Sequence, residues 1–344
     1  MTAASIDPPA PVVEAGPRDF VSPSPFAPAR LVPVILAFVA AALFPLVGDD
    51  YYTGLVSKIM IMAIFALSLE LLVGQTGLIC FGHAAFFGIG AYTVALTTPI
   101  DAPASLWLAL PLSMGAAALY ALPVGALSLR TKGVYFIMIT LAFAQMAYFV
   151  FHDAPFSGGS DGTYMYFRPD PAIGGWQPFD IEDSRSFYNM VLAALVLVFG
   201  LLAVMLRSRY GRALAGIRAN EQRMRAAGYP TYAYKLGVFV LSAALAGLAG
   251  FLYALKDGFV NPELLSWHES GTVLLMIILG GIGHLRGALL GAVAFTLLKE
   301  LFQSEQLLGS YAQHWQLWLG LTIIAFVAFM PRGLIGVFER GAQQ

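Results

Sequence analysis

The sequence predicts an all-α protein that crosses a membrane several times. Of its 344 residues 58% are hydrophobic and only 11% are charged, whereas soluble domains carry about 25% charged residues. One soluble core could not bury so much apolar surface, so lipid surrounds most of the chain. Apolar segments of membrane-spanning length also recur from residue 31 onward.

The number of spans follows from these apolar segments, since a span needs about 20 mostly apolar residues. We expect spans at about 31–48, 52–73, 77–98, 105–129, 134–151, 187–206, 235–255, 271–283, 286–303 and 315–331. The segment 271–283 is short for a full crossing. It forms either one arm of a helical hairpin with 286–303 or part of a broken helix. The sequence therefore predicts eight to ten spans, with ten preferred.

The two ends of the chain differ from this membrane domain, which we place at 31–336. Residues 1–30 are rich in Pro and Ala, and the six prolines between 8 and 25 favour an extended, disordered tail. Since no apolar core follows a basic start, we expect no cleavable signal. Residues 337–344 form a short C-terminal tail.

The orientation in the membrane follows from the basic loops. The segment 207–234 carries six arginines against the single acid Glu221, so the positive-inside rule makes it cytoplasmic. The segment 152–186 carries six acids and lies one span away, so it faces outside. With ten spans Asp49, Asp50 and Asp101 also fall outside. Arg130, Lys132, Arg332, Arg340 and both termini then fall in the cytoplasm.

No catalytic or nucleotide-binding motif is present. A phosphate-binding loop needs a lysine after a glycine, and none of the five lysines follows one. There is no H-E-x-x-H motif, no cysteine pair and no G-x-S-x-G motif, so we expect neither a metal site nor catalytic residues. The net charge of −1 gives no case for a nucleic-acid partner. An enzymatic function is therefore disfavoured.

The cytoplasmic segment 207–234 contains a predicted helix. Residues 211–227 are good helix formers, and Gly228 and Pro230 are typical of a stop. Ala213, Ile217 and Met224 lie near one face at helical spacing. That small, apolar face could dock on a partner protein. The alternative is a helix held to anionic lipid by its arginines.

Two glycine-rich stretches, 74–92 and 279–295, are similar in spacing. The matching pairs are Gly74 with Gly280, Gly77 with Gly283 and, within one residue, Gly82 with Gly287; Gly88 lies in the first stretch only. Paired glycine-interrupted segments in membrane transporters point to discontinuous helices near a solute path. Small residues also permit close helix packing. Both interpretations remain open.

Two ionisable residues interrupt the apolar segments. Glu70 follows a long apolar run, where a carboxylate is costly unless it faces protein or water. The alternative places it at the cytoplasmic interface. His83 is expected to bond a backbone carbonyl, with pH sensing as the alternative. Lys58, Lys299 and Glu300 lie near span ends and are expected to reach the interface.

Four stretches together resemble the permease family of branched-chain amino acid ABC importers, specifically its LivM-like subunit. They are GLICFGHAAFFGIGAY, GGSDG, GRALAGIRANEQRMRAAGYPTYAYKLGVFVLSAALAGLAG and LLMIILGGIGHLRGALLGA. They occur in the family's order, and the resemblance runs from about residue 50 to 336.

The resemblance implies a transport subunit of a bacterial inner membrane. Such permeases form the membrane channel of an importer, usually together with a second, LivH-like permease. Two cytoplasmic ATPase subunits bind ATP and Mg, and this chain itself binds no cofactor. A periplasmic binding protein delivers leucine, isoleucine, valine or a related small solute.

The resemblance also assigns roles to residues. It implies contact with the ATPase for Gly211, Arg212, Ala213, Ile217, Arg218, Glu221, Ala227 and Gly228. The family commonly has a second acidic residue after the arginine, where this chain has Ala219 and Asn220. For the translocation path or close helix packing we select Glu70, Gly74, Gly77, Gly82, His83, Gly88, Gly280, Gly283 and Gly287.

Three rival functions remain. The same architecture could import urea, short amides or other amino acids. A secondary transporter would use Glu70 and His83 as ion-coupling groups. A membrane enzyme or a purely structural membrane protein is the third rival, which the absence of any catalytic constellation disfavours.

Overall fold

The computed structural model describes residues 28–46, 48–99, 101–172, 176–177, 179–305, 309–330 and 333–336. The predicted C-terminal tail 337–344 lies outside the described residues. Residues 1–27 of the predicted N-terminal tail also lie outside the described residues, whereas residues 28–30 belong to the first helix.

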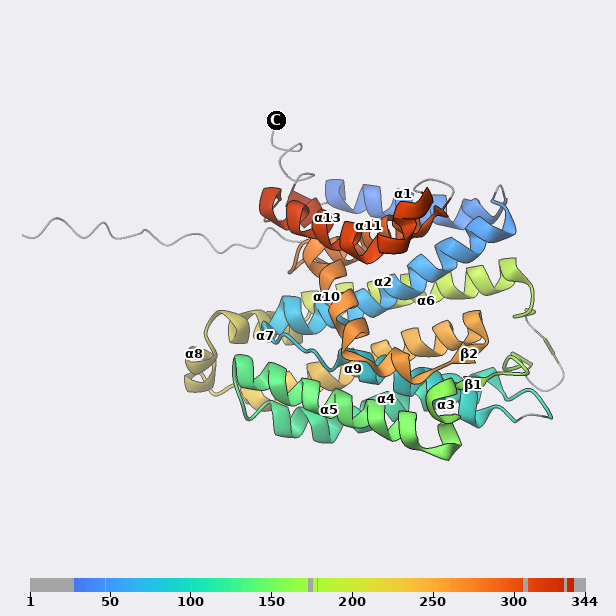
Figure 1. The fold of residues 1–344 in the computed structure, drawn as a ribbon. Coiled ribbons are helices and arrows are strands. Elements are labelled where there is room, and N and C mark those ends of the chain that lie inside the picture. Colours follow the sequence, from blue (N-terminus) through green and yellow to red (C-terminus); the bar gives the residue numbers. More distant parts are fainter. Residues whose placement is uncertain are drawn as a thin grey trace, which may run out of the picture.

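The described chain is mainly helical with almost no sheet, which confirms the all-α prediction (Figure 1). The α-helices are α1 (Pro28–Leu43), α2 (Asp50–Thr76), α3 (His83–Thr97), α4 (Leu106–Ser128), α5 (Val134–Asp153), α6 (Ser184–Arg207), α7 (Arg209–Ala219), α8 (Glu221–Ala226), α9 (Thr231–Asp257), α10 (Trp267–Gly280), α11 (Leu285–Gln303) and α13 (Trp315–Phe329). Strands β1 (Thr163–Tyr164) and β2 (Phe259–Val260) pair antiparallel. Short 3-10 helices lie at Phe44–Leu46, Pro155–Ser157, Gly159–Asp161, Pro262–Leu265 and Gly309–His314.

Every predicted span contains a helix, but the helices differ in length. Among the described residues six helical stretches are long and apolar enough to cross a membrane, or seven if the bent pair α10 and α11 is one span. The last of the six is the 26-residue stretch Tyr311–Gly336, which contains α13. The 16 residues of α1 and the 15 of α3 extend about 24 and 22 Å, short of a hydrocarbon core of about 30 Å. The ten-span count stays a prediction.

Helices α10 and α11 meet at an angle of 115°. The segment 271–283 was predicted to be either an arm of a hairpin or part of a broken helix, and the bend agrees with that expectation. The third predicted span, 77–98, was wrong at its start, because α3 begins only at His83. Gly77 ends α2 with a φ of 73°, a left-handed conformation that favours glycine.

Helices α2 and α9 form the centre of the bundle. In their most apolar windows 83% and 78% of the residues are buried, against 22% to 39% for the other four long helices. Helix α9 packs against α2, α3 and α4, and α2 packs against α6 and α11 (Figure 1). A helix that is apolar all round belongs in such a central position.

The loops gather at two opposite ends of the bundle (Figure 1). The end that holds α7 and α8 is called the arginine-rich end, and Lys132 joins it through an ion pair with Glu221. The end that holds β1 and β2 is called the acidic end, and there the Asp170 N–H donates to the Ala104 carbonyl. This grouping agrees with the predicted alternation of loops, whereas the membrane side of each end stays a prediction.

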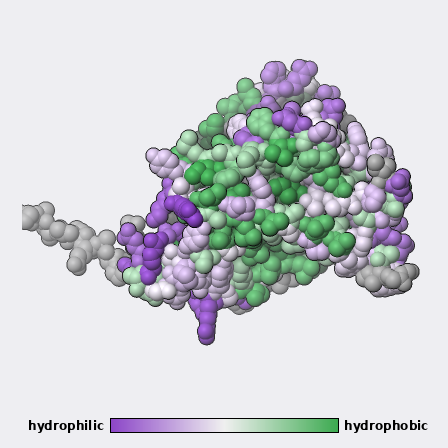
Figure 2. All heavy atoms as spheres, turned by 90° about the horizontal axis from the view of Figure 1, so that it is seen from below, coloured by the Kyte–Doolittle hydropathy of each residue, from purple (hydrophilic) through white to green (hydrophobic). Residues whose placement is uncertain are grey.

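The surface between the two ends is apolar. Figure 2 shows hydrophobic residues across the middle of one face and hydrophilic residues around its edges, at the left, the right and the top. Large side chains on the outside of the helices contribute to this surface, among them Leu108, Leu119, Met138, Leu197 and Val204. A band of this kind is what lipid contact requires.

Candidate functional site

The segment 207–234 folds into two helices instead of the single helix predicted over 211–227. Ser208 caps α7 by accepting from the N–H groups of Tyr210 at 3.2 Å and Gly211 at 3.4 Å. Asn220 is extended, with φ −158° and ψ 99°, and its side chain accepts from the Arg223 N–H at 2.9 Å. Because asparagine is a strong N-cap residue, it starts α8 and breaks the predicted helix.

The apolar face of α7 is already used inside the chain. Ala213, Leu214 and Ile217 are at most 4% exposed, and a Cβ at Gly211 would collide with the backbone of Leu206. The expectation that this face docks on a partner was therefore wrong. A partner that approaches this end meets the opposite face of α7, with Arg212, and the exposed surface of α8 with Ala227 and Gly228.

Arg218 connects α7 to the membrane helices. Its guanidinium donates a hydrogen bond to the carbonyl oxygen of Gly74, in the last turn of α2. The last carbonyls of a helix lack partners within the helix and carry partial negative charge. Arg218 thus satisfies one of these groups with a positive charge, and it lies beside the break between α2 and α3.

Glu70 connects α2 to the break between α10 and α11. Its side chain is fully buried, and Oε1 accepts from the Gly283 N–H at 2.6 Å. This burial excludes a Glu70 side chain that reaches out to solvent, whereas the depth of Glu70 in the membrane stays a prediction. Its other oxygen, Oε2, is buried and has no hydrogen-bond partner among the described residues.

The two glycine-rich breaks lie next to each other. Gly77 has a φ of 73° and Gly283 a φ of 97°, so these two equivalent glycines both take conformations that other residues avoid. Glu70 joins α2 to the break between α10 and α11 through the Gly283 N–H. Arg218 lies within 4 Å of a Cβ built at Gly77 or at Gly283. Arg218, Gly74, Glu70 and Gly283 are called the break cluster.

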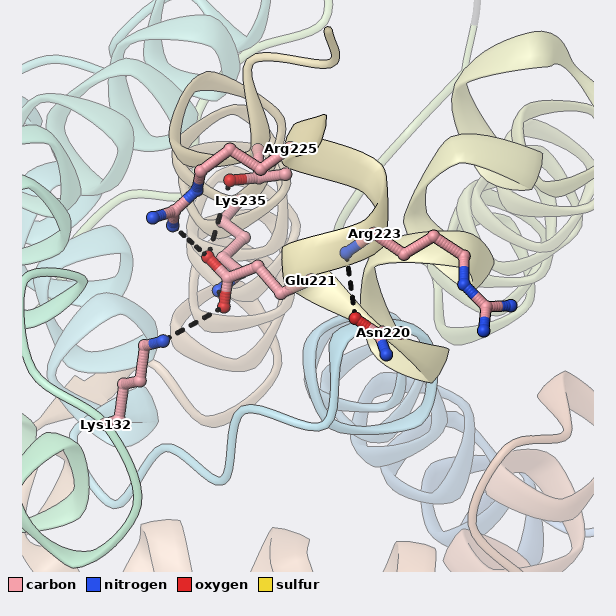
Figure 3. Close-up of polar contacts among 7 residues, drawn as sticks. Lys132, Asn220, Glu221, Arg223, Arg225 and Lys235 are labelled. Carbon is pink, nitrogen blue, oxygen red and sulfur yellow. Dashed lines mark hydrogen bonds and ion pairs between the residues drawn. The ribbon is translucent and has the colours of Figure 1, made fainter. Parts of the chain in front are cut away.

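Glu221 lies at the centre of a second group of contacts (Figure 3). Its carboxylate pairs with Lys235 at 2.7 Å, Arg225 at 2.9 Å and Lys132 at 3.7 Å. The Lys235 pair matters most, because the Lys235 side chain is 11% exposed, whereas exposed pairs contribute little. Figure 3 also shows that Arg223 points away from Glu221.

The charges around Glu221 change its acidity. Burial raises the pKa of the Glu221 carboxyl, but the hydrogen bond and charge of Lys235 and the charge of Lys132 outweigh burial and hold the pKa below its ordinary value. Glu221 is therefore a carboxylate at neutral pH. It ties α8 to the second turn of α9 and to the loop before α5.

Four of the selected glycines, Gly82, Gly88, Gly280 and Gly287, lie at close contacts between elements. A Cβ at Gly82 would collide with the backbone of Thr140 in α5, one at Gly88 with the Leu265 side chain, and one at Gly280 with the backbone of Gly287. The last contact packs α10 directly against α11. Which of these glycines also lines a solute path stays a prediction.

His83 is separate from the break cluster. Its Nε2 lies 2.8 Å from the Ser68 hydroxyl, so the expected bond to a backbone carbonyl was wrong. The Ser242 hydroxyl donates to the Ser68 carbonyl at 2.6 Å, and the Ser270 hydroxyl accepts from the Ala84 N–H at 2.9 Å. Small polar groups therefore join α2, α3, α9 and α10 around this ring.

Several of these partners could not be found from the sequence. Lys132 and Lys235 give no signal of their own as partners of Glu221, and the serines around His83 look like ordinary small residues. The one available signal was the single acid of 207–234, since an isolated carboxylate among arginines attracts cations. No group of three or more possible metal ligands occurs in the described part of the chain.

The family model for the permease component of branched-chain amino acid transport systems matches residues 51–328. The chain belongs to this family. Its members are transport permeases, so this chain is a multi-pass membrane permease and not an enzyme.

The permease is similar in sequence to individual transport permeases of other bacteria. It is 30% identical to the high-affinity branched-chain amino acid transport system permease protein LivM of Salmonella typhimurium, over 86% of this chain and 73% of that one. It is 29% identical to LivM of Escherichia coli, over 88% and 74%. The L-arabinose transport system permease protein AraH of Escherichia coli is 29% identical over only 44% and 43%. No solved structure matches the permease.

Proposed function

We propose that this permease is the membrane subunit of an ATP-driven importer for branched-chain amino acids. The two LivM proteins support the solute class, because they match the permease over nearly three quarters of their own length. The observation that carries the proposal is the position of Arg218, which joins the cytoplasmic helix α7 to the end of α2. A chain without a phosphate-binding loop needs an external source of energy, and α7 and α8 offer the surface that such a source would move.

The contacts suggest how this movement reaches the membrane. A cytoplasmic ATPase would press on the exposed face of α7 and on α8. Arg218 would pass the displacement to α2, and Glu70 would pass it to the break between α10 and α11. The ion pair of Glu221 with Lys235 would make α8 and α9 move together. In this proposal Gly211, Ala213 and Ile217 hold α7 in place, while Arg212, Ala227 and Gly228 lie toward the ATPase.

The proposal includes partners that this chain does not contain. They are a second, LivH-like permease, two ATPase subunits that bind ATP and Mg, and a periplasmic binding protein that delivers the solute. The permease itself binds no cofactor. It lies in the bacterial inner membrane with both termini in the cytoplasm, which agrees with the arginines of 207–234.

A second candidate keeps the architecture and changes the solute. The match to the L-arabinose permease favours it, since related chains serve solutes other than amino acids. Urea, short amides and other amino acids are the alternatives for this chain. The shorter coverage of the sugar permease supports this candidate less than the LivM proteins support the first.

The test is uptake of radiolabelled leucine by cells that carry the permease gene with its neighbouring transport genes, compared with cells that lack only the permease gene. Valine, alanine and urea are added as competitors. We expect uptake that depends on the gene and is blocked by valine but not by urea. Uptake blocked chiefly by urea would move the solute to the second candidate, and uptake unchanged by the deletion would contradict the proposal.

A further inference from the structure

A cavity of about 70 Å³ lies between α2, α9, α10 and α11. Its charged lining residues are Lys58 of α2, Glu269 of α10 and Lys299 of α11. Most of the other lining side chains are apolar, including Met62 and Phe295. This space, here called the charged cavity, shares no residue with the break cluster.

The charged cavity lies toward the acidic end of the bundle. Lys58 is in the third turn of α2, Glu269 in the first turn of α10 and Lys299 near the end of α11. Tyr51, at the start of α2, donates to Glu300 at the end of α11 at 2.7 Å, which places these helix ends together. Lys58 and Lys299 therefore line a cavity, whereas their positions near span ends had suggested only contact with the interface.

The three charged side chains line the same cavity without forming salt bridges with one another among the described residues. In the described part of the chain none of them is held in a salt bridge, although Glu269 lies within the electrostatic influence of both lysines. The Lys299 ammonium lies 5.4 Å from the ring centroid of Trp315. Since charges inside a membrane protein are costly, they mark functional sites by default.

Thr296 adds an independent observation. It lines the charged cavity, is 5% exposed, and its hydroxyl has no hydrogen-bond partner among the described residues. Elsewhere in the chain the hydroxyls of Thr76, Thr93 and Thr98 donate to the carbonyl four residues earlier. A buried hydroxyl without such a bond is unfavourable, so its partner is expected to come from the cavity.

We propose that the charged cavity binds a free α-amino acid as a zwitterion; this inference rests on the proposed function. Lys58 and Lys299 face its carboxylate, Glu269 faces its ammonium group, Thr296 supplies a hydrogen bond, and the apolar wall holds its side chain. A simple anion would leave Glu269 without a partner, and a simple cation would leave both lysines without one. The volume is room for about five water molecules. This matches the five non-hydrogen atoms of the amino-carboxylate group, so the side chain of leucine requires the cavity to widen along its apolar wall.

The test measures ligand-induced thermal stabilisation of the full-length permease, purified with the subunits that copurify. The ligands are leucine, 4-methylpentanoate, which lacks the amine, and 3-methylbutylamine, which lacks the carboxylate. Glu269→Gln removes the proposed ammonium partner. Thr296→Val removes a hydroxyl that has no partner in the described chain, so the variant keeps its unliganded melting temperature. Glu300→Gln is the matched control, because it changes a charge on α11 outside the cavity.

We expect leucine, and neither analogue, to raise the melting temperature of the wild type and of Glu300→Gln. In Glu269→Gln and Thr296→Val the leucine concentration for half of the shift should rise at least ten-fold. No shift in the wild type, or an equal shift in all variants, overturns the inference. Leucine uptake is measured in the same cells: uptake without any shift overturns the cavity alone, and a shift without uptake overturns the proposed function alone.

Discussion

Arg218 shows how one side chain can join two parts of a membrane protein. It leaves a helix on the arginine-rich end and donates to a carbonyl of α2, where the helix itself provides no donor. Glu70 does the same for the other break through Gly283. Of these contacts the sequence identified the ionisable residues, because an acid in an apolar run and an arginine in a family motif are visible. Their backbone partners were not visible, since they depend on how distant segments fold together.

Replacing Arg218 tests this connection. We expect Arg218→Gln to lower uptake at least about ten-fold, equivalent to about 1.4 kcal/mol, because the displacement of α7 no longer reaches α2. The amount of permease in the membrane should stay the same by immunoblot. The matched control is Arg223→Gln, which removes a charge that points away from Glu221 (Figure 3). Equal uptake by both variants would remove Arg218 from the coupling role.

The acidity of Glu221 gives a pH dependence. Because its pKa in the folded protein is lowered, the stability that it contributes is present above the ordinary glutamate pKa, about 4.3, and is lost as the pH falls through the lowered value. We expect hydrogen exchange of the α8 amides, corrected for intrinsic rates, to accelerate in this acidic range. Glu221→Gln should show faster exchange already at pH 7, by about 1–3 kcal/mol of lost protection. Wild-type protection that stays constant below pH 4 would contradict this assignment.

At the scale of elements, the apolar segments of the sequence predicted where the helices lie. They did not predict where the helices end, because the ends depend on capping residues and glycine conformations. Hydropathy shows that 77–98 is apolar, but it does not show the left-handed conformation of Gly77. Because that conformation ends α2, α3 begins only at His83. Asn220 was a readable signal, since asparagine favours N-caps. The prediction over 211–227 rested on the surrounding helix formers alone. The bend between α10 and α11 was anticipated because one segment was too short to cross alone.

The packing of α10 on α11 can be tested at Gly280. We expect Gly280→Ala to destabilise the permease by about 1–3 kcal/mol, because its methyl group would collide with the backbone of Gly287. Thermal unfolding in detergent measures the effect. Gly115→Ala in α4 is the control, since no atom lies within 4 Å of its Cβ position. It should be neutral or stabilising by up to about 1 kcal/mol. Equal melting temperatures for the two variants would contradict the close contact.

At the scale of the molecule, the loops lie at two opposite ends of the bundle (Figure 1). The arginines of 207–234 predict which of these ends is cytoplasmic. We therefore expect Ser160→Cys to react with a membrane-impermeant maleimide in intact cells, and Arg130→Cys to react only after permeabilisation. The native Cys80 is fully buried, so its background labelling should be low. Labelling of Arg130→Cys in intact cells would reverse the orientation.

The most direct test of the whole account is the energy source of uptake. The permease and its copurifying subunits are reconstituted in liposomes, and uptake of labelled leucine delivered by the binding protein is measured with ATP or a non-hydrolysable analogue on the ATPase side. A proton gradient is imposed in a parallel sample without ATP. The account predicts uptake only with hydrolysable ATP, and loss of that uptake in Arg218→Gln. Uptake driven by the proton gradient alone would contradict it and would point to a secondary transporter.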